Sequence, residues 1–88
     1  MALVLGLTVG DVVDIADYWI ALLSVDSRKS ATLITNDGEK VSVSSERETE
    51  IVPAVWVQLG PRTAGRSLRL QFEAPRAVSI SRRHHGAI

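Results

Sequence analysis

The side chains best suited to chemistry in this sequence gather near its C-terminal end. Arg82 and Arg83 close the run RLQFEAPRAVSISRR, and His84 and His85, the only histidines of the chain, follow them. A general base must be held in place by packed elements, and these histidines come after the last predicted strand. Adjacent imidazoles with neither a cysteine nor a spaced carboxylate do not form a zinc motif. The histidines therefore predict neither a catalytic base nor a metal site.

Other patterns that could support catalysis are incomplete. Asp11, Asp14 and Asp17 recur at intervals of three residues, but the glycine spacing of a calcium-binding loop does not accompany them. The chain contains no cysteine, which excludes disulfides and cysteine nucleophiles. It also contains no phosphate-binding loop and no dinucleotide-binding fingerprint. We expect a protein that is not an enzyme and that needs no cofactor.

The late arginines belong to an uneven charge distribution in a chain whose formal net charge is zero. Residues 1–59 contain four lysines and arginines against nine aspartates and glutamates, a net charge of −5. Residues 60–88 contain six arginines against one glutamate, a net charge of +5. Arginine presents a planar fork of donors that fits phosphate or carboxylate. Two interpretations stay open: a basic surface that binds nucleic acid, or opposite halves that attract each other or a second copy.

The length of the chain limits how these residues can be positioned. Eighty-eight residues form one domain, expected over 1–83 with a flexible tail at 84–88, and such a domain buries only about 60–65% of its unfolded surface. Its strands must close into a barrel or borrow strands from a partner, so self-association is expected. The opening MALVLGLTVG lacks a basic segment and soon reaches Asp11. We expect it to form a buried strand and expect no membrane association.

Alternating apolar and polar residues, rich in β-branched types, predict mostly strands. Asn36-Asp37-Gly38 follows the apolar run at 31–35 and predicts a tight turn. The stretch at 10–27 also fits a helical stripe, and periodicity alone leaves it open. Ser45-x-x-Glu48 resembles a capping box and predicts a short helix over 45–51. We expect an all-β fold of seven or eight strands, as a small barrel or two facing antiparallel sheets. The clearest further strands are VSV at 41–43, VWVQL at 55–59, LRLQF at 68–72 and AVSIS at 77–81.

An internal repeat organises the predicted strands. A shift of 37 residues places 18–44 on 55–81 with seven identities over 27 positions, and both turns superpose. The alternative is that short β-meanders resemble one another. The repeat favours a strand over 18–25, because its counterpart contains a glycine and a proline. The positions expected in the core are Leu22, Leu33, Leu59, Leu70 and Phe72, and most of the aromatic residues Tyr18, Trp19, Trp56 and Phe72 are expected there too.

Two segments together resemble the carbon storage regulator (CsrA/RsmA) family of small bacterial RNA-binding proteins. LRLQFEAPRAVSISRR resembles the ending of that family, where a strand, an Ala-Pro-basic turn and Val-Ser-Val-His-Arg follow one another. LVLGLTVGDVVDI is similar to its opening strand, its Val-Gly-acidic turn and its second strand. The resemblance covers most of the chain. It implies a compact β fold with interleaved subunits, and regulation of translation through GGA sequences in RNA hairpin loops.

Within the family, RNA binds where the first strand of one subunit lies beside the last strand of the other. Two departures bear on this site: the family's paired basic residues become Leu7-Thr8 here, and its His-Arg becomes Ser44-Ser45 at the end of the first repeat copy. The chain therefore resembles a divergent, partly duplicated member that completes its own fold. Carried over by position, the RNA-contacting residues are Leu5 and Leu7 in the first strand, Arg76 in the turn, and Val78, Ile80, Arg82 and Arg83 at the last strand.

Two functions follow from these observations. The first is an RNA-binding regulator of translation, whose partner is RNA and whose location is cytoplasmic. The second is a non-enzymatic structural or adaptor β-module, such as a phage assembly component or a partner-sequestering protein, which binds a protein or a second copy and is associated with a virion. Arg62 and Arg66 flank a Thr-Ala-Gly turn, and we expect that turn to be solvated.

Overall fold

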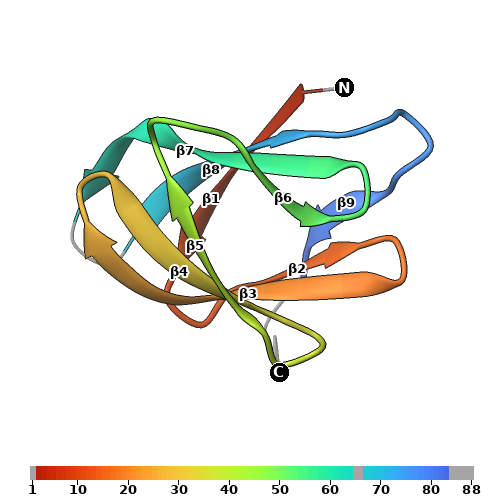
Figure 1. Cartoon of the computed structure of the whole chain (residues 1–88), viewed down its shortest axis with the longest axis horizontal. Coiled ribbons are helices and arrows are strands. Elements are labelled where there is room, and N and C mark those ends of the chain that lie inside the picture. The colour runs from red at the N-terminus through yellow and green to blue at the C-terminus, as the bar shows by residue number, and fades with distance from the viewer. Residues whose placement is uncertain (1, 65–66, 84–88) are drawn as a thin grey trace.

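Nine antiparallel strands and no helix occur in the part of the chain that the computed structural model describes, which is residues 2–64 and 67–83, with side chains for all of these outside 61–67 (Figure 1). The all-β expectation is confirmed, and residues 12–25 are strands. The strand count exceeds the expected seven or eight. The strands are β1 (Ala2–Thr8), β2 (Val12–Ile15), β3 (Tyr18–Ser27), β4 (Ser30–Thr35), β5 (Lys40–Ser44), β6 (Thr49–Val52), β7 (Val55–Ala64), β8 (Ser67–Glu73) and β9 (Ile80–Arg82).

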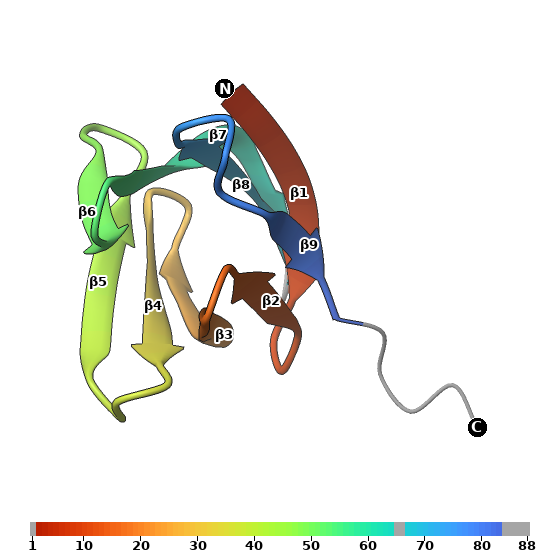
Figure 2. The ribbon, with the colours of Figure 1, turned by 90° about the vertical axis from the view of Figure 1, so that its right-hand side faces the viewer.

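The strands form two facing sheets, as expected (Figure 2). Sheet A has the order β1-β8-β7-β6, and sheet B has the order β5-β4-β3-β2-β9. Every pairing in both sheets is antiparallel. Gly38 has a φ of 83° and ends the predicted Asn36-Asp37-Gly38 turn between β4 and β5, a conformation that glycine adopts readily.

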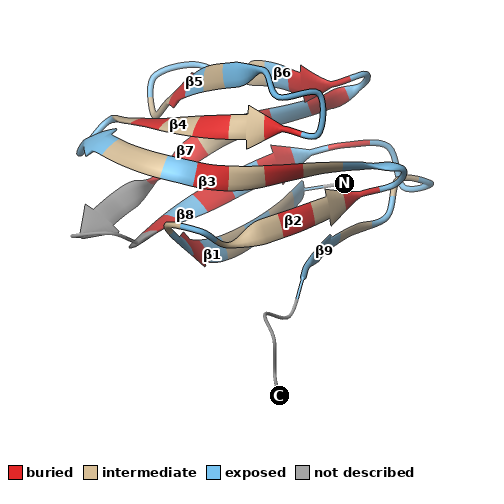
Figure 3. Ribbon diagram, turned by 90° about the horizontal axis from the view of Figure 1, so that it is seen from below, coloured by how far each residue is buried: buried red, intermediate tan, exposed pale blue. Residues whose placement is uncertain are grey.

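The core lies between the sheets and is built from alternate residues of each strand (Figure 3). Along β4, Ala31, Leu33 and Thr35 are buried while the residues between them are half-buried. In sheet A, Leu68, Leu70 and Phe72 point the same way from β8. All five positions predicted for the core are buried, because a residue two places along a strand returns to the same face. They are Leu22, Leu33, Leu59, Leu70 and Phe72.

The expectation that most aromatic residues are core is wrong. Phe72 is buried, but Trp56 and Tyr18 are 42% and 38% exposed and Trp19 is half-buried. The cause is strand parity: the flanking Val55 and Val57 both face the core, so Trp56 must face outward. The tryptophans therefore lie on the outer faces of the two sheets.

The strands show where the two repeat copies correspond and where they part. The bounds of β2 and β3 reappear 37 residues later as those of β6 and β7, and the starts of β4 and β8 differ by the same number. The third strands differ, because β5 pairs with β4 whereas β9 pairs with β2 of the other sheet. The edge of β8 is already taken by β1, so the chain after Pro75 crosses to sheet B.

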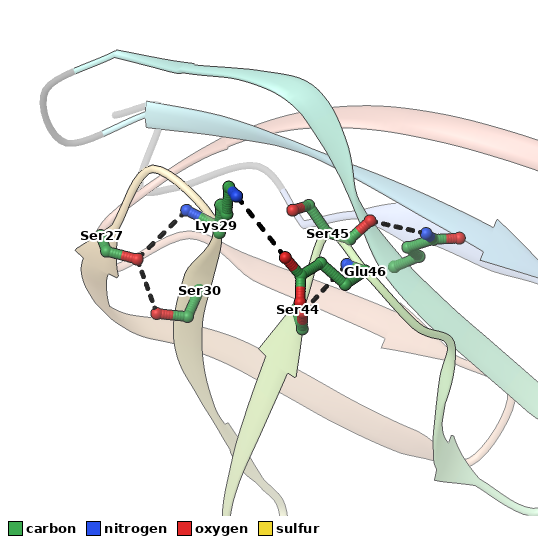
Figure 4. Close-up of polar contacts among 7 residues, drawn as sticks. Ser27, Lys29, Ser30, Ser44, Ser45 and Glu46 are labelled. Atoms are coloured by element: carbon green, nitrogen blue, oxygen red, sulfur yellow. Dashed lines mark hydrogen bonds and ion pairs between the residues drawn. The ribbon is translucent and has the colours of Figure 1, made fainter.

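The short helix predicted over 45–51 is wrong. The segment bends at 45–47, and Thr49–Val52 pairs with β7 as strand β6. The local polar groups take other partners: the Ser44 hydroxyl accepts the Glu46 N–H at 2.9 Å, and Lys29 pairs with the Glu46 carboxylate at 3.5 Å (Figure 4). The Gln58 amide also donates to the Ser45 carbonyl at 2.8 Å. Contacts with Lys29 and Gln58, which are distant in sequence, thus form in place of the capping box.

Some expectations fall outside the described residues. These concern the tail at 84–88, with His84 and His85, and the side chains of Arg62 and Arg66. Within the described ranges, no helix is long and apolar enough to cross a membrane.

Candidate nucleic-acid interface

The first and last strands meet at one corner of the molecule, where both are edge strands (Figure 2). We call this corner the β1–β9 seam. It comprises residues 4–8 of β1 and residues 80–82 of β9. The sheets are not paired there through their backbones, since β1 pairs with β8 and β9 pairs with β2. The Arg82 side chain crosses the seam, and its Nη1 donates to the Gly6 carbonyl at 2.6 Å.

Even-numbered residues of β1 direct their backbone groups toward the seam. Thr8 uses both its N–H and its carbonyl in bonds with Asp11, and the Gly6 carbonyl accepts from Arg82. Antiparallel strands alternate in the direction of their backbone groups, so Leu5 and Leu7 direct theirs toward β8. The backbone groups of β1 that face the seam therefore belong to Val4, Gly6 and Thr8.

The same alternation applies to β9. The Ser79 carbonyl accepts from the Ala16 N–H, and the Arg83 N–H donates to the Val12 carbonyl, each at 2.8 Å. These odd-numbered residues face β2, so the N–H and carbonyl groups of Ile80 and Arg82 face the seam. Both edges of the seam thus present backbone donors and acceptors without a strand partner, the kind of groups that hydrogen-bond the edges of unpaired bases.

Arg83 lies outside the seam and is bound to a carboxylate. Its Nε donates to Asp14 Oδ2 at 3.1 Å, and its Nη2 donates to Asp14 Oδ1, forming a two-pronged ion pair. Both side chains remain partly exposed, at 49% for Arg83 and 40% for Asp14. The hydrogen bond from Arg83 lowers the pKa of Asp14 and raises the pKa of Arg83 itself. An incoming phosphate must compete with Asp14 for this guanidinium.

The residues predicted to contact RNA lie on β1, on β9 and on the chain just before and after β9, and they differ in access. Leu7 is buried, and Leu5, Val78 and Ile80 are half-buried against the core. Arg76 is exposed on the turn at 74–79 between β8 and β9. Arg82 is the exposed cation that reaches the seam itself. The apolar members therefore hold the strands in place, and the polar surface comes from backbone groups and arginines.

Three residues in or near this corner are not among those predicted from the sequence: Gly6, Arg69 and Asp14. Arg69 of β8 pairs in register with Gly6, and its exposed side chain has no hydrogen-bond or ion-pair partner among the described residues. The signal for Arg69 was present in LRLQF, because a cation between two buried leucines must point to the outer face. No local signal links Asp14 to Arg83, which lies 69 residues away.

The outer face of sheet A changes character along β8. The outward residues run from Arg69 through Gln71 to Glu73, and the last is beside Trp56. A shallow hollow at the acidic end is lined by residues that include Val4, Glu48, Gln71 and Glu73. Carboxylates disfavour phosphate at that end. Anion binding on this face therefore belongs at the Arg69 end, next to the β1–β9 seam.

The outer face of sheet B is more apolar than that of sheet A at matched positions. A shift of 37 residues relates Ala21, Leu23 and Ile34 of sheet B to Gln58, Gly60 and Gln71 of sheet A. Leu23 is 41% exposed, and Ala21 is paired in register with Ile34. This face suits contact with another protein surface better than contact with a charged backbone.

No group of three or more histidine, cysteine, aspartate or glutamate side chains is placed to hold a metal ion within the described ranges. In comparisons with protein-family models, with curated proteins and with solved structures, the chain matches none of them.

Proposed function

We propose that this protein is a non-enzymatic, CsrA-like RNA-binding protein that regulates translation by covering GGA-type single-stranded or hairpin-loop RNA. One observation carries the proposal: two adjacent edge strands direct backbone groups that have no strand partner toward a single seam, and the exposed Arg82 lies across it. Single-stranded RNA offers splayed bases to such groups, which duplex nucleic acid does not.

The charge near the seam supports the same proposal. Arg82 donates to a neutral carbonyl and keeps its full charge, and Arg76 is exposed with no partner among the described residues. The half-buried Val78 and Ile80 pack against the core and hold the last strand in position. A guanidinium on an anchored strand loses less conformational entropy when it meets a phosphate. The seam would thus bind bases through backbone groups and phosphates through arginines.

The decisive substitution is Arg82→Ala. We expect it to weaken binding of a labelled GGA-loop RNA hairpin by about 1–3 kcal/mol. The slope of log affinity against log salt concentration, here called the salt slope, should become less steep by about 0.7, because one phosphate contact is lost. Arg47→Ala is the matched control, because Arg47 is an exposed arginine on the β5–β6 connection, on the opposite side of the molecule (Figure 2). Affinity that is unchanged by Arg82→Ala at both of two salt concentrations would overturn the assignment.

A second candidate function, a structural or adaptor β-module, is favoured by the apolar outer face of sheet B. Leu23 is exposed there beside the half-buried Ala21 and Ile34. Ordered oligomers on size-exclusion chromatography, together with no RNA affinity at low salt, would establish this second function in place of the first.

A further inference from the structure

Gly6 is a glycine that the fold itself does not require. Its φ is not among the positive values of the described glycines, which occur at Gly10 and Gly38. A Cβ built on Gly6 would meet nothing within 4 Å. Glycine weakens a strand, because it loses the most backbone entropy and contributes no side chain to the sheet. A glycine inside a strand often marks a bulge, a tight bend or the close approach of another group, and the regular pairing of β1 with β8 across Gly6 leaves the close approach.

Gly60 shows what a structurally required glycine looks like in the same sheet. A Cβ there would lie 3.1 Å from the Arg69 Cβ and 3.3 Å from the Arg69 carbonyl oxygen. Gly60 therefore makes room for Arg69, whereas the space above Gly6 on the other side of Arg69 is open. A glycine therefore lies beside Arg69 on each adjoining strand, Gly6 on β1 and Gly60 on β7.

Two arginines flank the open space at Gly6. Arg69 pairs in register with Gly6 from β8, and Arg82 donates to the Gly6 carbonyl from β9. Neither guanidinium has a carboxylate partner among the described residues. Two unneutralised cations on either side of a gap are unfavourable unless an anion lies between them. Each also keeps donors that no other described residue accepts.

We propose that the surface over Gly6 is a phosphate subsite in which Arg69 and Arg82 bind one phosphodiester from opposite sides. This inference rests on the proposed RNA-binding function and adds to it the position of the strand: the RNA backbone crosses β1 at Gly6 and continues onto the outer face of sheet A. The RNA backbone does not continue toward Glu73, because that end of the face is acidic.

The test is to fill the gap without disturbing the fold. Gly6→Val places a side chain in the open space, and because valine favours strands we expect the melting temperature to stay the same or rise. We expect the affinity for a labelled GGA-loop hairpin to fall about tenfold, with a salt slope less steep by about 0.7. Arg69→Gln should do the same, and the double variant should lose little more, because both changes remove one phosphate contact.

Two controls separate this from general effects. Ala2→Val adds bulk on the same outward side of the same strand, and Arg47→Gln removes a cation far from the seam. Both should leave affinity within about twofold, which is small beside the tenfold expected for a lost charge-assisted contact. Inorganic pyrophosphate should shift the Gly6 and Leu7 amide resonances of the wild type but not those of Arg69→Gln.

The outcomes distinguish the two proposals. RNA binding that survives Gly6→Val unchanged overturns the subsite and leaves the RNA-binding function intact. A wild type that binds no hairpin at either salt concentration overturns the function. In that case a pyrophosphate shift confined to Gly6 and Leu7 would uphold the phosphate subsite, and its absence would overturn the subsite as well.

Discussion

Arg82 and Arg83 are adjacent in the sequence, yet their guanidinium groups are bound to different elements. Arg82 donates to the Gly6 carbonyl of β1, and Arg83 pairs with the Asp14 carboxylate of β2. Only Arg82 keeps an uncompensated charge among these contacts. The difference follows from strand parity, since neighbouring residues of a strand point to opposite faces. At the residue scale, therefore, Asp14 acts as an internal competitor for any phosphate that approaches Arg83.

Asp14→Asn tests this competition. The change removes the carboxylate charge, so Arg83 becomes available, and we expect severalfold tighter binding of the GGA-loop hairpin and a salt slope steeper by about 0.7. Asp17→Asn is the matched control, because it removes the same charge from an exposed turn residue with no arginine partner among the described residues. Equal affinities for the two variants, measured by fluorescence anisotropy, would show that Asp14 does not restrain Arg83.

The same ion pair gives a pH-dependent contribution to stability. The hydrogen bond from Arg83 lowers the pKa of Asp14 below its ordinary value of 3.8. For a lowered carboxyl pKa, the contribution is present above the unfolded value and is lost as pH falls through the folded value. We expect wild type to melt above Asp14→Asn at pH 7, and the two melting temperatures to converge below pH 3.8. A difference that persists at pH 2 would contradict this.

At the scale of elements, β4 contains the one buried side-chain polar atom without a hydrogen-bond partner among the described residues. Thr35 is buried at the end of the strand, and its Oγ1 has no partner, although its N–H and carbonyl are bonded within the β4–β5 turn. Thr35 is the third member of the buried face of β4, and the other two members, Ala31 and Leu33, are apolar. The hydroxyl therefore loses its water without a compensating bond.

Thr35→Val should stabilise the fold. Valine has the same shape and removes the unsatisfied hydroxyl, so we expect a gain of about 1 kcal/mol, seen as a rise of roughly 4–8 °C in melting temperature. Thr32→Val is the control on the opposite face of β4, because its hydroxyl donates to Asp26 at 2.7 Å. That bond also lowers the pKa of Asp26. The control should melt below wild type, and a loss of stability in Thr35→Val would contradict the assignment.

At the scale of the whole molecule, the two sheets share one core. Leu33 of sheet B and Leu70 of sheet A are both fully buried in the same cluster. Each sheet also contains one tryptophan on its outer face, Trp19 in sheet B and Trp56 in sheet A. The sheets should therefore unfold together, and the two tryptophans provide a separate reporter for each.

Leu33→Ala and Leu70→Ala should each cost about 2–5 kcal/mol, which is a large part of the stability of a domain this size. In backgrounds that carry only Trp19 or only Trp56, through Trp56→Phe or Trp19→Phe, urea unfolding followed by fluorescence should give coincident transitions for each leucine variant. Separate midpoints, with Leu33→Ala affecting only sheet B, would show that the sheets do not share one cooperative core.

The sequence by itself determined most of the strands and most of the core. Alternation identified Leu33, Leu70 and Phe72 as buried, because a strand places every second residue on one face. The same rule, applied to Val55-Trp56-Val57, places Trp56 outside, whereas the general preference of aromatic residues for the core predicts the opposite. The helix predicted over 45–51 is wrong for a different reason, since Gln58 and Lys29 are distant in sequence from Ser45 and Glu46, the residues that they bind.

Only the tertiary structure decided which strands pair and which groups the arginine side chains contact. The crossing of β9 to sheet B depends on β1 having taken the edge of β8, a contact between opposite ends of the chain. Arg82 meets Gly6 across 76 residues of sequence, and Arg83 meets Asp14 across 69. Local periodicity contains no information about such partners, because they depend on the register and order of whole sheets. The sequence therefore predicts which residue types form the candidate site, and the structure shows how those residues are arranged.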